Sequence, residues 1–234
     1  ISREDILLSV AHSGDASRVF VGSSDARVYE LDTTAEKPEP QAMEGHQSYV
    51  SGLVQTGMQL ISGSFDGTLI WWDLETREQI RVVDAHQKWI RQIAISPDGS
   101  LVASVADDMV CRVWKTGRGK LVHELKGHAE KTPHHFPSML YACGFSADGQ
   151  FLATADRAAQ TQSLLCLDRN SGRQLWRTVV HRGHLETRGN KKSTQASCSA
   201  ACDGMRVYVN FLNNGSVYTT ALDLDGRQVW QTAI

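Results

Sequence analysis

The sequence repeats itself every 41 or 42 residues, and this repetition limits the possible folds more than any other feature. The segments SSDARVYELD, SFDGTLIWWD and ADDMVCRVWK place Asp25, Asp66 and Asp108 at that spacing. Each unit holds short alternating apolar stretches separated by turn residues, which is typical of antiparallel β-strands. One such unit cannot bury its apolar side alone, so several units must stack around a shared core.

The repeated pattern resembles that of the WD-repeat β-propeller family. The matching elements are Gly-His or Ala-His pairs ending at His46, His86 and His128, the turns SPDG (96–99) and SADG (146–149), and a closing Trp-Asp. The resemblance covers residues ~4–156. It implies an all-β propeller of about five four-stranded blades, centred near 6–32, 50–74, 90–115, 139–168 and 195–234. WD propellers usually have seven blades, so the five either close, stay open, or form part of a larger seven- or eight-bladed ring.

The resemblance also implies a structural role for the recurring polar residues. In WD repeats a His, a Ser or Thr, the turn Asp and a Trp commonly form a hydrogen-bonded tetrad inside a blade. The matching positions are His46, Ser62 or Ser64, Asp66 and Trp72; His86, Ser104, Asp108 and Trp114; and His128, Thr154 and Asp156, with no Trp in this last set. The first blade has Asp25 but neither the His nor the Trp.

A Ser, His and Asp set also suggests a hydrolase. Catalysis needs one asymmetric arrangement, whereas this set recurs from unit to unit, and buried polar groups must pair with one another in any case. We therefore predict no catalytic residue. Phosphate-binding and metal-binding motifs are absent from the sequence, and the His-rich segment KTPHHFP (131–137) is interpreted as an inserted loop, so we predict no metal site.

The repeat changes from residue 163. SLLCLDRNSGRQLWRTVV (163–180) matches TTALDLDGRQVWQTAI (219–234), with Trp176 and Trp230 54 residues apart. This resembles the repeat of pyrroloquinoline-quinone (PQQ) propellers over residues ~160–234. The resemblance implies that Trp176 and Trp230 dock one blade against the next.

The spacing of the repeats predicts one continuous array. Asp168 and His181 are 13 residues apart, as are Asp73 and His86, so the fourth blade begins in WD style and ends in PQQ style, with RAAQTQ (157–162) as a longer turn. We predict a single propeller or partial propeller over 1–234, with WD blades in 1–156 and PQQ-like blades in 157–234. The alternative is a gene joined from two propellers.

Two local features complete the prediction of structure. Asn214–Gly215, between two alternating apolar segments, predicts a type I′ hairpin turn. The five cysteines include no CxxC pair, and Cys198 and Cys202 would lie ~13 Å apart in an extended strand, beyond the ~4.4–6.8 Å that a disulfide needs. We expect every cysteine to be unbridged.

The propeller resemblance also indicates where a partner would bind. The entry of each innermost strand and the residue before each turn Asp face the narrow end, where partners of WD propellers commonly dock. These positions are Tyr49, Ser51, Phe65, Trp89, Arg91, Asp107 and Tyr141. Aromatic residues and Arg are typical interface anchors, although some of these side chains could instead pack between blades. We predict a protein or peptide partner at this face.

Charge and composition exclude few function classes. The net charge is −2, with −7 in residues 1–156 and +5 in residues 157–234, so we expect no nucleic-acid partner. The basic segment 182–192 is either a solvated loop or an anionic contact. No apolar run approaches the ~20 residues of a membrane span. The chain begins at Ile1, so the missing leader says little, and the compartment stays open between cytoplasmic and extracytoplasmic, including the bacterial periplasm.

The sequence therefore favours a non-enzymatic propeller scaffold that needs no cofactor. Two alternatives stay open: a fragment of a PQQ-dependent dehydrogenase, or an extracytoplasmic assembly or sensor propeller. The PQQ enzymes carry a Trp platform, calcium ligands and usually two adjacent cysteines, and no adjacent pair occurs in this sequence.

Overall fold

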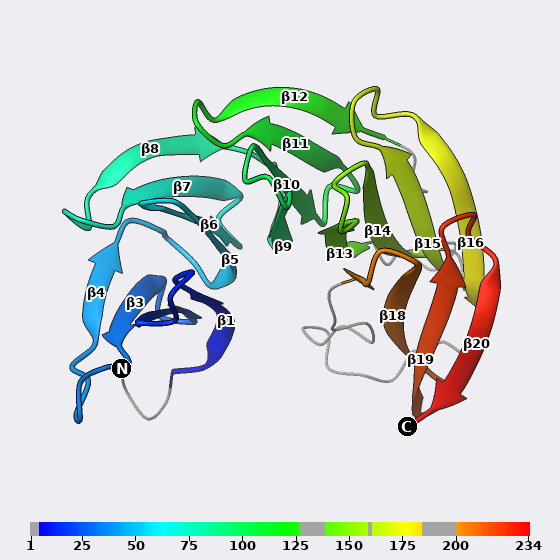
Figure 1. Ribbon diagram of the computed structural model, residues 1–234, viewed down its shortest axis with the longest axis horizontal. Coiled ribbons are helices and arrows are strands. Elements are labelled where there is room, and N and C mark those ends of the chain that lie inside the picture. The colour runs from blue at the N-terminus through cyan, green and yellow to red at the C-terminus, as the bar shows by residue number, and fades with distance from the viewer. Residues whose placement is uncertain (1–4, 127–138, 159–160, 184–199) are drawn as a thin grey trace. The chain divides into compact units, whose positions relative to one another are not determined.

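The computed structural model describes residues 5–126, 139–158, 161–183 and 200–234, without the side chains of 139, 141 and 151–158. In these ranges the chain forms twenty strands and no helix (Figure 1). The strands make five four-stranded antiparallel sheets, each built from four strands that are consecutive in the sequence. The predictions of an all-β fold and of about five four-stranded blades are confirmed.

The strand bounds follow the predicted blades and extend each of the first four by an outer strand. The first sheet contains β1 (Leu7–His12), β2 (Arg18–Ser23), β3 (Arg27–Asp32) and β4 (Gln41–Glu44), and the second β5 (Val50–Thr56), β6 (Gln59–Ser64), β7 (Thr68–Asp73) and β8 (Gln79–Asp84). The third contains β9 (Ile90–Ile95), β10 (Leu101–Ala106), β11 (Cys111–Lys115) and β12 (Lys120–Leu125). The fourth contains β13 (Met139–Phe145), β14 (Phe151–Ala158), β15 (Thr161–Asp168) and β16 (Gln174–Arg182), and the fifth β17 (Ala201–Cys202), β18 (Arg206–Asn213), β19 (Ser216–Asp223) and β20 (Gln228–Ala233).

The turns lie where the sequence places Asp, Asn and Gly. Gly67 has φ +87°, and Asn214 and Gly215 have φ +48° and +76°, as a type I′ hairpin requires. The longer turn expected over 157–162 is wrong, because β14 and β15 stay paired as far as Ala158 and Thr161. That segment contains no Gly, Pro or Asn to interrupt the two strands.

The chain divides into two compact units, Ile1–Ile95 and Ser96–Ile234. This division does not coincide with the predicted change of repeat after residue 156, and the single continuous array stays a prediction. Each unit is described by itself below.

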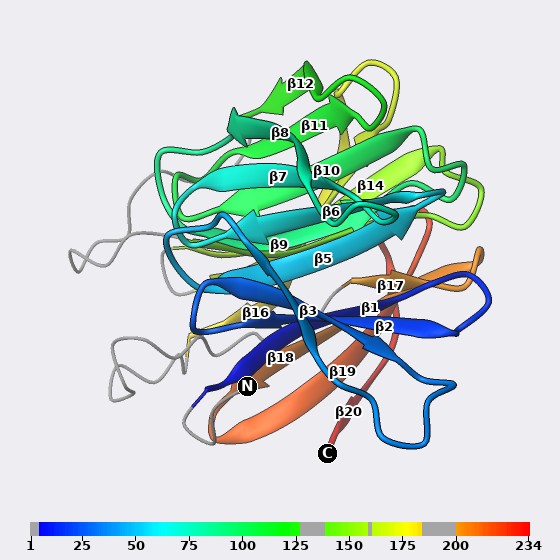
Figure 2. The ribbon, with the colours of Figure 1, turned by 90° about the vertical axis from the view of Figure 1, so that its left-hand side faces the viewer.

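The first unit buries its apolar side chains between the first and second sheets, which form two stacked layers in Figure 2. The core takes Phe20, Val28 and Met43 from the first sheet, and Val50, Leu53, Leu60, Ile70, Trp72 and Leu74 from the second sheet and the residue after it. Trp72 is only 1% exposed, so the indole and its N–H must find their partners inside the protein.

The second unit has a comparable core between the fourth and fifth sheets. It consists of Ala142, Leu164, Ala200, Val207, Val209, Phe211 and Leu222. The side chains of β18 alternate between buried and half-buried, so one face of the fifth sheet packs against the fourth sheet and the other does not.

Four cysteines in the described ranges are free, and Cys198 lies outside those ranges. Burial raises the pKa of Cys111 and of Cys166 to about 12. These two thiols therefore stay protonated at neutral pH and act as small apolar packing groups.

Candidate functional site: a buried polar tetrad and an exposed aromatic cluster

The second sheet brings four of the predicted residues into one hydrogen-bonded set. His46 precedes β5, Ser62 lies on β6, Asp66 occupies the β6–β7 turn and Trp72 lies on β7. His46 Nε2 is 2.7 Å from Ser62 Oγ and His46 Nδ1 is 3.0 Å from Asp66 Oδ2. The Trp72 indole N–H donates to Ser62 Oγ over 2.8 Å. Of the two candidate serines, Ser62 lies between the His and the Trp.

The charge state of Asp66 sets the direction of these hydrogen bonds. Burial raises the pKa of Asp66, but hydrogen bonds from His46, the Gln47 backbone and Thr68 outweigh burial and hold the pKa well below its ordinary value. The ionised carboxylate can only accept, so His46 Nδ1 carries the proton toward it. In the neutral imidazole, Nε2 then accepts from the Ser62 hydroxyl, whose oxygen accepts from Trp72.

These pairings reproduce the Ser, His and Asp contacts of a hydrolase triad, but the set is closed. Ser62 is 0% exposed and His46 is 6% exposed. A nucleophile must reach a substrate carbon, and Ser62 Oγ has no surface open to one. The arrangement instead satisfies buried polar groups and ties the loop before β5 to two strands of its sheet.

The second predicted set is divided between the two units. In the first unit His86 is 9% exposed and its backbone N–H donates to Gly67 O over 2.8 Å. In the second unit the Trp114 indole N–H donates to Ser104 Oγ over 2.9 Å, the same pairing as in the second sheet. Asp108 Oδ2 accepts from Arg112 Nη1 over 2.9 Å.

The predicted polar positions of the first and fourth sheets differ more from the tetrad of the second sheet. In the first sheet Asp25 accepts from the hydroxyl of Tyr29 over 2.5 Å, so Tyr29 replaces the missing His as the partner of the turn carboxylate. His128 and the side chains of Thr154 and Asp156 lie outside the described residues.

Four predicted binding residues meet in the first unit, and we define them as the aromatic cluster: Tyr49, Phe65, Trp89 and the adjoining Arg91. Phe65 and Trp89 stack with ring centroids 4.8 Å apart and an interplanar angle of 3°, and Tyr49 lies 5.5 Å from Phe65. The Arg91 guanidinium is 5.1 Å from the centroids of both Phe65 and Trp89, within cation–π range. Tyr49 and Trp89 are each 41% exposed.

Hydrogen bonds to the backbone hold the aromatic cluster in place. The Phe65 backbone N–H donates to Tyr49 O over 2.9 Å, and Ser51 Oγ donates to Ile90 O over 2.5 Å, which joins β5 to β9. Ser51 is therefore a half-buried strand contact and does not present a free hydroxyl. The rings reach solvent from a fixed arrangement, so a partner would not need to order them.

The two other predicted binding residues belong to the second unit. Asp107 is only 8% exposed, which contradicts the exposure that a partner contact requires. Its position at the end of the fully buried strand β10 explains the burial. The side chain of Tyr141 lies outside the described residues.

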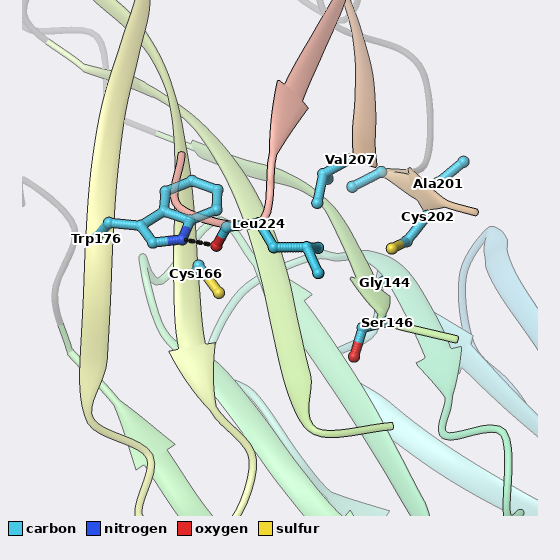
Figure 3. A pocket seen from close by; sticks show the side chains of 9 residues that line it. Gly144, Ser146, Cys166, Trp176, Ala201, Cys202, Val207 and Leu224 are labelled. Atoms are coloured by element: carbon cyan, nitrogen blue, oxygen red, sulfur yellow. Dashed lines mark hydrogen bonds between the residues drawn. The ribbon is translucent and has the colours of Figure 1, made fainter. Parts of the chain in front are cut away.

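The repeated tryptophans of the second unit have different surroundings. The Trp176 indole N–H donates to Leu224 O over 2.7 Å, so this side chain on β16 contacts the turn between β19 and β20 (Figure 3). Trp230, at the matching place on β20, is 37% exposed and lies 6.0 Å from Tyr208, ring centroid to ring centroid.

Sequence reasoning missed several polar residues that hold these sets together. Thr68 Oγ1 donates to Asp66 Oδ1 over 2.7 Å, and Thr178 Oγ1 donates to Gly226 O over 2.5 Å beside Trp176. The Trp-x-Thr string recurs 54 residues later and was a usable signal for Thr178. No repeat marks Thr68, because Val110 occupies the matching place in the next unit.

The four-stranded sheets define the fold as that of a β-propeller, and part of the chain matches WD repeats. The family model "WD domain, G-beta repeat" matches residues 38–73 and 77–115. A chain in the "Crystal Structure of Mitotic Checkpoint Complex" matches 100% of this chain and 65% of its own length, with a TM-score of 0.75 and 18% identity, which shows the fold. The PQQ-type character of the last repeats stays a prediction.

Individual relatives match parts of the chain. Nuclear distribution protein nudF of Aspergillus niger is 32% identical over 109 residues, which are 45% of this chain and 25% of the relative. The guanine nucleotide-binding protein G(I)/G(S)/G(T) subunit beta-1 of Homarus americanus is 24% identical over 208 residues, 81% of this chain and 58% of the relative. The chain thus spans less than two thirds of the length of each of these relatives.

Proposed function

We propose that this chain is a non-enzymatic scaffold that binds a protein or peptide through the aromatic cluster on the narrow face. One observation carries the proposal: Tyr49 and Trp89 remain 41% exposed although both belong to an ordered stack. Large exposed aromatic side chains are unfavourable in water unless a partner covers them. Aromatic residues and Arg are also the residue types that contribute most to binding at protein interfaces.

The chemistry of the cluster favours a partner with an apolar anchor beside a carboxylate. The apolar group would cover the Tyr49 and Trp89 rings, and the carboxylate would lie near Arg91. Two similar proteins are described as parts of an assembly: one is a subunit of a guanine nucleotide-binding protein, and the other is a chain in a checkpoint complex. These descriptions support a role in assembly.

The test is a selection of peptides from a random display library, with the chain as bait. Peptides that bind the wild-type chain are then titrated against Trp89→Ala/Arg91→Ala. We expect at least tenfold weaker binding with unchanged circular dichroism. The matched control is Met58→Ala/Val82→Ala, which removes two apolar side chains elsewhere in the same unit that are more exposed than Trp89 (56% and 51%) and should leave binding unchanged. Wild-type affinity in the cluster variant would overturn the proposal.

The second candidate, a PQQ dehydrogenase fragment, is favoured by the contact that Trp176 makes with the next repeat. The donor set does not fit the enzyme's metal, since the described residues include no group of three or more His, Cys, Asp or Glu that could hold an ion. Titration with PQQ and Ca²⁺, followed by absorbance and by dye-linked alcohol oxidation, separates the two functions. Saturable binding with turnover would favour the dehydrogenase.

A further inference from the structure

The tip of the β18–β19 hairpin places a free side-chain amide next to a free backbone N–H. Asn214 and Gly215 form the whole loop, because Asn213 and Ser216 on either side are paired in the ladder. Both loop residues are exposed and left-handed, with φ +48° and +76°. In the part of the chain that the structure describes, neither the Asn214 carboxamide nor the Gly215 N–H has a hydrogen-bond partner. The amide and the nitrogen that can attack it are therefore both unrestrained.

Asn170 offers the nearest comparison, because it is also exposed in a turn. There the next backbone N–H, that of Ser171, donates to Asp168 Oδ1 over 2.7 Å. This hydrogen bond holds the nitrogen that would have to attack the Asn170 side chain. Ser171 also carries a side chain that hinders the attack, whereas Gly215 has none.

The asparagines within β18 are restrained by the sheet. Asn213 is only 7% exposed, and its Nδ2 donates to Gly183 O over 3.0 Å. Asn210 lies in the middle of the strand, where the residues on both sides of it are paired in the ladder. Among the asparagines of the described ranges, Asn214 thus combines exposure, an unbonded amide and an unbonded N–H on the next residue.

We propose that Asn214 is a self-modification site, at which the chain converts this asparagine to isoaspartate and aspartate. Asparagine is a chemically labile residue type. The Gly215 nitrogen attacks Asn214 Cγ and forms an N–Cγ bond, the Cγ–Nδ2 bond breaks, and ammonia leaves with the proton from Gly215. Water then opens the cyclic imide: addition at Cγ gives aspartate, and addition at the Asn214 backbone carbonyl gives isoaspartate. Water enters and ammonia leaves, so the reaction is balanced without an oxidant or a cofactor.

The isoaspartate product should open this end of the fifth sheet. It routes the chain through the side chain and adds a backbone carbon to a two-residue loop, whose geometry must match the twist of both strands. Loss of the closing pair Asn213–Ser216 would release the hydrogen bond from Asn213 to Gly183. The strands concerned supply Phe211 and Leu222 to the core of the second unit. The aspartate product adds only a negative charge, and neither outcome depends on the proposed function of the aromatic cluster.

The first test incubates the purified whole chain at mildly alkaline pH, where more of the Gly215 amide is deprotonated. Peptide mapping by mass spectrometry measures the conversion of amide to acid, and methyl transfer from labelled S-adenosylmethionine by a purified isoaspartyl methyltransferase counts isoaspartate. We expect conversion at Asn214 at least tenfold faster than at Asn170. The matched control, Asn214→Gly, keeps a residue that accepts the left-handed conformation but has no amide, so methyl acceptance should stay at its initial level. Equal conversion rates at Asn214 and Asn170 would overturn the proposal.

The second test separates the change of backbone from the change of charge. Hydrogen exchange of the backbone amides in β18 and β19 is compared between the isoaspartate fraction of the incubated chain and Asn214→Asp, which carries the charge on an ordinary backbone. We expect exchange near Asn213 and Ser216 to be at least tenfold faster in the isoaspartate fraction and unchanged in Asn214→Asp. Isoaspartate that leaves exchange at the wild-type rate, or equally fast exchange in Asn214→Asp, would contradict the opening of the hairpin.

Discussion

Replacing Ser62 by Ala tests whether the tetrad stabilises the first unit. The substitution removes the oxygen that accepts the Trp72 indole N–H and the hydroxyl beside His46 Nε2. Ser62 is 0% exposed, so water cannot replace either partner without a structural change. A buried polar group left unpaired costs about 1–3 kcal/mol, so two of them should lower the free energy of unfolding by about 2–6 kcal/mol.

This loss is large against the ~5–15 kcal/mol that usually stabilises a domain. Urea unfolding, monitored by tryptophan fluorescence and by circular dichroism, measures the loss directly. Thermal unfolding should show a decrease in Tm of roughly 4–24 °C, at about 2–4 °C per kcal/mol for a chain of this size. In a Trp72→Phe background, Ser62→Ala should cost at least ~1 kcal/mol less, since the indole donor is already gone.

Ser64→Ala is the matched control on the same strand. Ser64 is also 0% exposed, but its partners are backbone groups of two half-buried residues: Ser64 Oγ donates to Ser48 O over 3.0 Å and accepts the Asp66 N–H over 3.1 Å. The two backbone partners belong to partly exposed residues and can turn toward water after the truncation, so we expect a smaller loss of about 1 kcal/mol. A Ser62→Ala variant within ~0.5 kcal/mol of wild type, or one no less stable than Ser64→Ala, would refute the reasoning.

Two further predictions concern acid stability and the turn under Trp176. The folded pKa of Asp66 lies below its unfolded value of ~3.9, so its stabilising contribution is present above pH ~4 and is lost as the pH falls through the folded pKa. Asp66→Asn should therefore lose less of its urea midpoint between pH 5 and 2 than the wild type, and parallel curves would contradict this. Gly226→Ala should lose at least ~2 kcal/mol, because left-handed strain and contact with the Trp176 ring add. Gly57→Ala has φ +53° but nothing within 4 Å, so it should show the strain alone, and equal losses in the two variants would rule out the contact.

Much of the fold could be predicted because its signals are local. Alternating apolar residues and Asp–Gly or Asn–Gly turns specify a strand and its end within a few residues, which is why the blade positions agree with the sheets. The prediction for residues 157–162 was wrong because it also used only local sequence. The extra residues between the two strands suggested a longer turn, but pairing between β14 and β15 extends both strands to Ala158 and Thr161.

The candidate sites were less predictable, because their contacts join residues far apart in the chain. The sequence could not separate Ser62 from Ser64, since alternation places both on the same face of one strand and only the position of the His46 ring distinguishes them. The burial of Asp107 likewise depends on neighbours that no local pattern reports.

The sequence by itself determined the repeat, the order of strands and turns within it, and the residue type at each position. It could do so because the period of apolar residues and the chemistry of turns act over a few residues. Tertiary structure decided which of those residues meet: that Phe65 stacks on Trp89, and that Trp176 is held by a following turn while Trp230 is left exposed. The physical reason is that identical local sequences have identical donors, whereas partners and burial come from the sheet that packs against them.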